Sequence, residues 1–366
     1  MQCLGPDAVF ANAASTHGLG LVAKGLIEHA RSDIAARVGA HADEIVFTSG
    51  ATESNNLALK GTFGEELSRN SRLLTTRIEH KSVLDSAEQV ARRGVAVGYL
   101  VTDACGRVDL DALASTLRAK ATALVSVMHV NNEIGTWQEI EAIAALCRAH
   151  GALLHVDAAQ SVGKLPVLLE DWGVDFCSLT AHKICGPKGI GALYVRRGRR
   201  LAAQLHGGGH EHGLRAGTLA THQIVGMGAC YALAEPASEM PEIERLSQRL
   251  WAGLAAIEGV ARNGSAATSI PNIVNVRFPG VDGESLRLAL ADLAVSAGSA
   301  CNSADVEPSY VLKSLGLSDV AAAGSLRFSI GRFTTESEID RAVERATEEV
   351  SRLRSLAPNA PNWCLS

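Results

Sequence analysis

The chain has 366 residues, of which 47% are hydrophobic and 20% are charged, and its formal net charge is −5. The length predicts two domains with a large core, and the composition is that of a globular protein rather than a disordered one. The weak negative charge argues against direct binding to nucleic acid or to an anionic membrane surface. No apolar stretch approaches the roughly 20 residues that span a bilayer, and the first residues lack the pattern of a signal peptide. We therefore expect a cytoplasmic protein without membrane contact.

Short apolar segments alternate with helical patterns along the first two thirds of the chain. The segments predicted to be strands are 44–50, 123–130, 152–157, 175–180 and 191–197. A helix is predicted over 139–151, where a glycine closes it. Apolar strands that alternate with helices predict an α/β fold with a mainly parallel sheet, covered on both faces.

The pattern changes near residues 235–241, which contain Pro236 and Pro241. A long amphipathic helix follows to about residue 257. Beyond it the sequence predicts strands at 272–278 and 325–333, helices near 284–293 and over 336–356, and a loop of small residues at 296–303. We therefore predict a large domain at 1–236 and a smaller α+β domain at 237–366.

Polar residues follow four of the predicted strands, at the edge where an open α/β sheet binds its ligands. These strand ends carry Gly50-Ala51-Thr52, Asn131-Asn132, Asp157 with Gln160 one turn on, and Thr180 with His182 and Lys183. We expect all four groups to project to one edge of the sheet.

This set of residues suits pyridoxal phosphate (PLP), which needs a lysine for its aldehyde, a carboxylate beside its pyridine nitrogen and a cup for its phosphate. Lys183 and Asp157 can supply the first two. Ala51 and Thr52 open a helix, where free N–H groups and the helix dipole favour an anion. Taken singly, Lys183 is more simply a surface lysine and Asp157 a helix N-cap. Their positions at the ends of successive strands favour the cofactor site.

Seven segments have long and specific sequences: GATESNNLALKG, EHKSVLD, SVMHVNNEIG, HVDAAQSVGKLP, AHKICGPKGIGALYVRR, HGGGHEHGLRAGT and SAGSACNSADVEPSYVL. They closely resemble the cysteine desulfurases of the IscS/NifS group, which belong to the class V aminotransferase-like enzymes of PLP fold type I. The resemblance runs from about Met1 to Leu356. It implies PLP as the cofactor and a large domain built on a mostly parallel seven-stranded sheet, with a smaller α+β domain after it that carries the catalytic cysteine loop.

The resemblance also implies a role for each matching position. Lys183 resembles the lysine that binds the cofactor's aldehyde, Asp157 the partner of the pyridine nitrogen, and His80 the histidine stacked on the ring, a candidate acid/base. The other implied cofactor-binding positions are Ala51, Thr52, Asn132, Gln160, Thr180, His182 and Thr218, of which Thr218 would be lent by the second subunit of a homodimer. Arg327, assisted by Asn12, resembles the clamp for the substrate carboxylate, which a guanidinium can grip with two hydrogen bonds.

Eight cysteines are spread along the chain without a CxxC pair. Most of them are expected to be free thiols on small buried residues, a description that suits Cys147, Cys177 and Cys230. Cys185, just after the cofactor lysine, is expected to be passive. Cys301 resembles the family's sulfur acceptor, and it lies in SAGSACNSA, whose small residues favour a mobile loop.

The segment from His206 to His212 contains three histidines and a glutamate, which are good zinc ligands. The family carries a similar glycine-rich loop without a structural metal, so we expect no metal site here. The loop is instead predicted to lie beside the cofactor at the dimer interface. His155, inside a buried strand, is predicted to be a core histidine whose hydrogen bonds are satisfied.

The sequence departs from the family pattern mainly at its start. Family members begin with a short strand and an Ala-Thr-Thr-Pro turn, whereas the resemblance here begins after that turn, and Ala11 and Ala13 replace the usual Gly and Pro around Asn12. Thr180 replaces a Ser, and Cys185 replaces a Tyr. The tail, LAPNAPNWCLS, is shorter than in the IscS branch, where this segment helps to hold the iron–sulfur scaffold protein.

The sequence therefore predicts a homodimeric cysteine desulfurase that converts L-cysteine to L-alanine and leaves a persulfide on Cys301. The sulfur would serve iron–sulfur cluster assembly or the thiolation of tRNA and cofactors, through acceptor proteins such as an iron–sulfur scaffold. Two alternatives stay open. One is a selenocysteine lyase-like or aminotransferase-like activity, although Cys301 argues against plain transamination. The other is a truncated partner subunit or sulfur relay, which the missing turn motivates.

Overall fold

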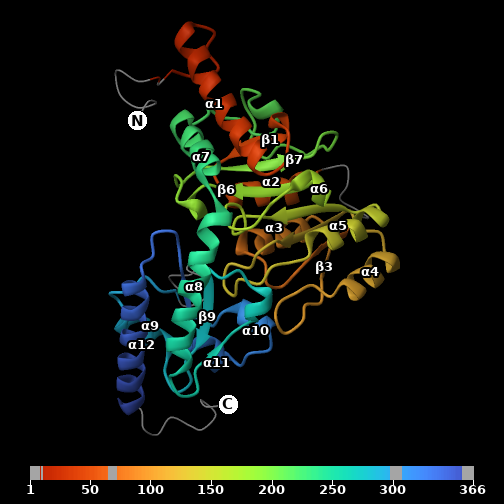
Figure 1. Cartoon of the computed structure of the whole chain (residues 1–366). Helices are drawn as coiled ribbons and strands as arrows, with labels where there is room; N and C mark the ends of the chain where they lie inside the picture. The colour runs from red at the N-terminus through yellow and green to blue at the C-terminus, as the bar shows by residue number, and fades with distance from the viewer. Residues whose placement is uncertain (1–8, 10, 65–71, 297–306, 357–366) are drawn as a thin grey trace. The chain divides into compact units, whose positions relative to one another are not determined.

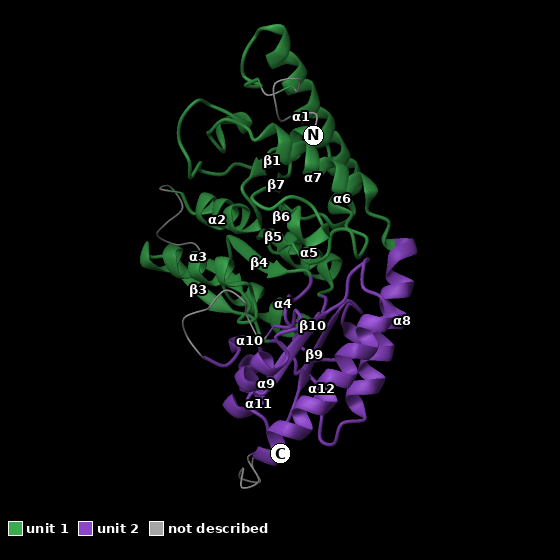
Figure 2. Cartoon of the chain, turned by 90° about the vertical axis from the view of Figure 1, so that its left-hand side faces the viewer, with its two compact units in different colours: residues 1–101, 109–129, 138–236 green, residues 102–108, 130–137, 237–366 purple. Residues whose placement is uncertain are grey.

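The computed structural model of the chain describes residues 9, 11–64, 72–296 and 307–356. The chain divides into two compact units, coloured green and purple in Figure 2. Unit 1 comprises residues 1–101, 109–129 and 138–236, and unit 2 comprises residues 102–108, 130–137 and 237–366. Two short segments from the first half of the chain therefore belong to unit 2. That 1–236 and 237–366 are separate domains stays a prediction.

Unit 1 is built on a seven-stranded sheet with the strand order β1-β7-β6-β5-β4-β2-β3 (Figure 1). Its strands are β1 (Ile45–Thr48), β2 (Arg72–Thr75), β3 (Ala96–Tyr99), β4 (Leu124–Met128), β5 (Leu153–Asp157), β6 (Phe176–Thr180) and β7 (Gly191–Val195). β7 pairs antiparallel with β1 and β6, and the other pairings are parallel. The predicted α/β class with a mostly parallel seven-stranded sheet is confirmed.

The five strands that the sequence predicts in this unit are present, and each is shorter than its apolar segment. β2 and β3 are the strands that the sequence does not predict. β3 lies at the edge of the sheet, and its residues are exposed or only partly buried. It therefore lacks the continuous apolar run by which a central parallel strand is identified.

Helices cover the sheet of unit 1. They are α1 (Gly18–Arg37), α2 (Ala51–Thr62), α3 (Lys81–Arg92), α4 (Leu110–Ala119), α5 (Ile140–Ala149), α6 (Leu169–Trp172) and α7 (Thr221–Leu233). Every residue of β4, β6 and β7 is buried, as expected for strands covered on both faces. α1 and α7 lie against each other (Figures 1 and 2), and a Cβ on Gly228 of α7 would stand only 2.6 Å from the Cβ of Ala30. Glycine at this position permits the close contact between the two helices.

Unit 2 is a smaller α+β unit. Its elements are α8 (Pro236–Ala255), β8 (Ala261–Arg262), β9 (Ile273–Arg277), α9 (Gly283–Ala289), α10 (Tyr310–Ser314), α11 (Asp319–Ala323), β10 (Ser325–Ser329) and α12 (Glu336–Leu356). The strands form an antiparallel sheet in the order β10-β9-β8. The predicted strand 325–333 ends earlier, at Ser329. None of the described helices of either unit is long and apolar enough to cross a membrane.

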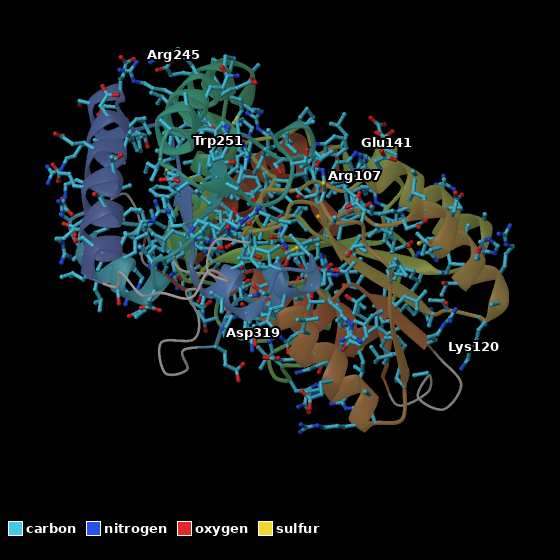
Figure 3. The ribbon with its side chains drawn as sticks, turned by 90° about the horizontal axis from the view of Figure 1, so that it is seen from below. Arg107, Lys120, Glu141, Arg245, Trp251 and Asp319 are labelled. Carbon is cyan, nitrogen blue, oxygen red and sulfur yellow. The ribbon has the colours of Figure 1, made fainter. Side chains whose placement is uncertain are left out.

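The core of unit 2 joins its long helices to its sheet through buried side chains such as Leu250, Val276, Leu326 and Ala346. Charged side chains add exposed contacts between α8 and α12. Arg245 of α8, labelled in Figure 3, pairs with Glu336 of α12 at 2.6 Å. Exposed pairs of this kind contribute little stability. Burial of the apolar core therefore contributes most of the stability of the contact between these helices.

Candidate active site

The strand directions bring the carboxyl ends of six strands to one edge of the unit 1 sheet. β1 and β6 both run antiparallel to β7, so they run in the same direction. β5, β4, β2 and β3 continue that direction through parallel pairings. Because Thr48, Asp157 and Thr180 end β1, β5 and β6, they lie at the same edge. Three of the four predicted strand-end groups therefore follow strands that end at one edge of the unit 1 sheet, whereas the fourth, Asn131-Asn132, belongs to unit 2.

Asp157, at the end of β5, is held by two hydrogen bonds. Its side chain is buried, and its Oδ2 accepts a hydrogen bond from Asn55 Nδ2 of α2 at 2.8 Å. Its Oδ1 accepts the backbone N–H of Ala159 at 2.9 Å. A carboxylate can accept about four hydrogen bonds, so capacity remains for a further donor. The arrangement suits a carboxylate that pairs with a protonated ring nitrogen.

The start of α2 offers backbone donors at the same edge. Gly50 is the N-cap and makes no side-chain cap, so no described N-cap side chain occupies the helix N-terminus at Ala51 and Thr52. Gly191 of β7 permits this approach, because a Cβ there would lie 2.6 Å from the Gly50 Cα. Thr52 is exposed. Free N–H groups and the dipole of a helix N-terminus attract an anion such as a phosphate.

The acidic residue in the first turn of α2 is neutralised from outside the helix. Glu53 pairs with Arg215 at 2.9 Å and accepts the N–H of Ser49 at 2.6 Å. Burial alone would raise the pKa of Glu53, but the hydrogen bonds from Arg215 and Ser49 outweigh it and lower that pKa. The negative charge of Glu53 is therefore tied to a cation and opposes an anion at the helix start less than a free carboxylate would.

Positive charge gathers after β6. The buried Thr180 hydroxyl and His182 Nδ1 are 2.9 Å apart, and His182 and Lys183 lie in the short helix η2 (His182–Ile184) with their side chains exposed. Partial burial, followed by the charges of Lys183, Lys188 and Lys164, lowers the pKa of His182. Three lysines are thus close enough to act on one imidazole, which makes this end of the sheet favourable for an anion.

Gln160 is buried one turn after Asp157, and its Oε1 accepts a hydrogen bond from Lys164 Nζ at 2.9 Å. Gln160 therefore orients one of the lysines that act on His182. This bond uses the side-chain oxygen and leaves the amide Nε2 of Gln160 as a donor for other partners.

His80 is the N-cap of α3, and its side chain is half-buried. Its Nδ1 lies 2.8 Å from Ser82 Oγ and accepts the Ser82 backbone N–H at 3.2 Å. These two contacts fix the orientation of the imidazole at the start of the helix.

Asn132 and Arg327 belong to unit 2 and are joined there. Arg327 Nη1 of β10 donates to the Asn132 carbonyl at 2.8 Å, and Nη2 donates to Ser296 Oγ at 3.3 Å. Glu133, beside Asn132, is buried and accepts the hydroxyl of Ser309. Burial raises the pKa of Glu133, against the opposing effects of Ser309 and the Arg327 charge. The contacts hold the Arg327 guanidinium in one place.

Asn12 and Thr218, two further predicted site residues, lie in exposed segments of unit 1. Asn12 is exposed, and its Oδ1 accepts the N–H of Ala14 at 2.9 Å in the turn before α1. Thr218 is exposed in the segment before α7. Cys301 lies outside the described residues, so its predicted role stays a prediction.

The glutamate of the histidine-rich segment from His206 to His212 forms an ion pair within unit 1. Glu211, in the short helix η3 (Glu211–Gly213), accepts hydrogen bonds from Arg31 Nη1 and Nη2 at 2.8 and 2.9 Å and from the Phe47 N–H at 2.6 Å. Gly217 N donates to His210 Nδ1 at 3.4 Å. Among the described residues, no group of three His, Cys, Asp or Glu side chains could hold a metal ion.

Sequence reasoning missed the polar residues that connect the predicted ones. Asn55 contacts both Asp157 and Ser82, and Glu79 lies fully buried one residue before His80. Asn55 stands one turn after Thr52 on α2, so the helical period could have placed it on the side that faces the sheet. Ser82 follows a helix N-cap, where local hydrogen bonds are common.

The residues of unit 1 fit PLP. The buried Asp157 has room for one more donor, the helix start and the lysine cluster suit a phosphate, and Lys183 is exposed in the turn beside them. The chemistry that the arrangement can support is that of a carbonyl cofactor held at a sheet edge.

Known proteins resemble this chain along most of its length. The model of the aminotransferase class-V family matches residues 8–342. The cysteine desulfurase IscS of Proteus mirabilis (strain HI4320) is 54% identical over 363 residues, which are 98% of this chain and 90% of that protein. The solved structure of a NifS-like protein has a TM-score of 0.88 at 35% identity and covers 94% of this chain and 93% of that one. The structure of SspA in complex with cysteine has a TM-score of 0.79 at 36% identity, over 89% of this chain and 92% of that one.

Proposed function

The chain belongs to the aminotransferase class-V family, and we propose that it is a PLP-dependent cysteine desulfurase. It converts L-cysteine to L-alanine and leaves a persulfide on Cys301, from which sulfur passes to iron–sulfur cluster assembly or to the thiolation of tRNA and cofactors. The observation that carries the proposal is the likeness, at 54% identity over 98% of the chain, to a cysteine desulfurase. The site residues of unit 1 support it, because they fit the cofactor of that chemistry.

The proposed cofactor-binding roles fall to the residues that the sequence predicts. Lys183 binds the aldehyde of PLP, and Asp157 holds the proton on the pyridine nitrogen. The phosphate and the ring are held by Ala51, Thr52, Asn132, Gln160, Thr180 and His182, with Thr218 reaching the site of the partner subunit in a homodimer. When bound, PLP supplies an electron sink for the carbon–hydrogen and carbon–sulfur bonds of the substrate.

His80 and Arg327 handle the substrate. The structure of SspA in complex with cysteine supports cysteine as a ligand of this fold. Arg327, whose guanidinium is oriented by the Asn132 carbonyl and Ser296, grips the substrate carboxylate with help from Asn12. His80 moves protons to and from the substrate as an acid/base group.

Cys301 receives the sulfur. Its thiolate attacks the sulfur of the substrate cysteine, so that an S–S bond forms and the Cβ–S bond breaks. The electron pair of the broken bond stays with carbon, which takes up a proton to become the methyl group of alanine. The persulfide then passes its terminal sulfur to an acceptor protein such as an iron–sulfur scaffold. The enzyme acts in the cytoplasm.

Substitution of the cofactor lysine tests the cofactor assignment. We expect the wild-type protein to be yellow when supplied with PLP and Lys183→Ala to lose the absorption band of the lysine-bound cofactor. Lys120→Ala is the control, because Lys120 is an exposed lysine at the end of α4 (Figure 3), and it should keep the band. A wild-type protein that stays colourless with added PLP contradicts the proposal.

Sulfide release tests the reaction. With cysteine and a reductant, the wild type should release sulfide and form alanine in equal amounts, and Cys301→Ala should abolish both while the protein stays yellow. Cys185→Ala is the matched control, since Cys185 is an exposed thiol two residues after Lys183. A yellow wild-type protein that releases no sulfide would refute the desulfurase activity, and loss of release in Cys185→Ala instead would move the acceptor role to that thiol.

A further inference from the structure

A chain of hydrogen bonds joins two predicted site residues of unit 1 that lie on different elements. Asn55 Nδ2 is 2.8 Å from Asp157 Oδ2 and also 2.8 Å from Ser82 Oγ. Ser82 Oγ is in turn 2.8 Å from His80 Nδ1. The chain therefore runs from the carboxylate at the end of β5, through α2 and the first turn of α3, to the imidazole at the N-cap of α3.

The direction of each bond follows from the donors and acceptors present. An ionised carboxylate only accepts hydrogen bonds, so the amide group of Asn55 must turn its NH₂ toward Asp157. The same NH₂ carries a second hydrogen, which it donates to Ser82 Oγ. The Asn55 Oδ1 is buried and has no hydrogen-bond partner among the described residues. A flipped amide would place that oxygen against the carboxylate, which electrostatic repulsion opposes.

The backbone N–H of Ser82 donates to His80 Nδ1 at 3.2 Å, so this nitrogen is an unprotonated acceptor. The Ser82 hydroxyl, whose oxygen accepts from Asn55, then directs its own hydrogen to the same Nδ1. A neutral imidazole carries its proton on the other nitrogen in that case.

We propose that Ser82 is a positioning residue that keeps His80 in the Nε2–H tautomer and ties its ring, through Asn55, to Asp157. The proposal rests on the acid/base role of His80 in the proposed function. It sharpens that role, because the resting enzyme presents a proton donor at Nε2. It also makes Asn55 a shared support, since one amide group orients the carboxylate that holds the cofactor and the histidine that serves the substrate.

The α3 helix provides a matched control for this proposal. Ser86 lies one turn after Ser82 on the same helix and is also buried, but its hydroxyl has no hydrogen-bond partner among the described residues. Ser82→Ala and Ser86→Ala therefore remove the same atom from the same helix, and only the first removes a contact to His80.

The decisive experiment is ¹⁵N NMR of the histidine-labelled holoenzyme, in which the His80 signals are assigned by their loss in His80→Gln. We expect the wild type to show an unprotonated Nδ1 and a protonated Nε2 on His80. Ser82→Ala should shift the Nδ1 resonance or populate the second tautomer, Ser82→Thr should restore the wild-type signal, and Ser86→Ala should leave it unchanged. A wild-type His80 that carries its proton on Nδ1 overturns the proposal, as does a Ser82→Ala spectrum equal to that of Ser86→Ala.

Kinetics give a second readout. Loss of one hydrogen bond to the acid/base group should lower kcat for alanine formation roughly three- to tenfold in Ser82→Ala, while the cofactor content and KM stay near wild type. An equal loss of cofactor would indicate a merely structural role and contradict the proposal. Failure of the proposed function would appear separately, as a wild-type enzyme without sulfide release, and would leave the NMR result to stand by itself.

Discussion

Glu79 shows how a single residue can make the stability of unit 1 depend on pH. It is fully buried one position before His80, and it accepts the Thr76 hydroxyl at 2.7 Å. Burial, with a smaller contribution from the negative charge of Asp157, raises the pKa of Glu79 to about 8. The carboxyl group is therefore neutral in the folded protein at neutral pH, whereas it is ionised in the unfolded chain.

The sign of the effect follows from this difference. Above the ordinary pKa of 4.5 the unfolded chain releases a proton that the folded protein keeps, so stability falls as the pH rises, until the folded group ionises near pH 8. The free energy of unfolding falls by at most about 1.4 kcal/mol per pH unit. We expect Glu79→Gln, which stays neutral, to remove this slope when the cofactor-loaded proteins are unfolded in urea at pH 5, 6.5 and 8. Parallel curves for the two proteins would contradict the raised pKa.

His155 is the core histidine that the sequence predicts. It is fully buried on β5, and its two ring nitrogens lie 2.8 Å from Ser126 Oγ and 3.0 Å from Ser178 Oγ on the neighbouring strands. Burial lowers its pKa to about 3, so the ring is neutral. The residue links three strands just before Asp157 and has both of its nitrogens satisfied, which agrees with a structural role.

At the scale of elements, one buried ion pair attaches the histidine-rich loop to the rest of unit 1. Arg31 of α1 binds Glu211 through both Nη atoms, donates to the Ile45 carbonyl at 2.6 Å, and lies over the Phe47 ring at 4.5 Å. Glu211 has a positive φ of 49°, which is strained for a residue other than glycine. The ion pair therefore holds a strained turn in the segment that leads to Thr218.

This pair gives an element-scale prediction with an internal control. Arg31→Met leaves the Glu211 carboxylate buried without its partner, which should cost about 3–5 kcal/mol of unfolding free energy. Arg249 of α8 also pairs through two bonds, with Asp340 of α12, but both side chains are exposed. Arg249→Met should therefore change the urea midpoint little. Equal losses in the two variants would show that burial does not govern these ion pairs.

At the scale of the whole molecule, cofactor binding should couple to global stability. A ligand that binds only the folded chain stabilises it by mass action, by about 2.7 kcal/mol at 100 times its Kd. We expect removal of PLP to lower Tm by several degrees, and re-addition to restore it. The difference should shrink in Asp157→Ala, which loses the partner of the ring nitrogen. A Tm that does not respond to PLP in the wild type would contradict the cofactor site.

The fold could be predicted from the sequence to the extent that burial leaves a local pattern. The segments that became β4, β5, β6 and β7 are apolar because they are covered on both faces, and so they are visible without a structure. β3 was not predicted, because an edge strand with exposed residues has no such pattern. The direction of β7 was not predicted either, since an apolar run has no sign that distinguishes a parallel strand from an antiparallel one.

The sequence by itself determined the strand-end set of Asp157, Thr180 and Lys183 and its likeness to a PLP enzyme, because these signals lie within short, continuous segments. Only the tertiary structure decided which polar groups support them. Asn55 reaches Asp157 across 102 positions of the chain, and Arg31 reaches Glu211 across 180. Hydrogen bonds depend on distance and direction in space, and no local pattern encodes a contact between residues so far apart in the sequence.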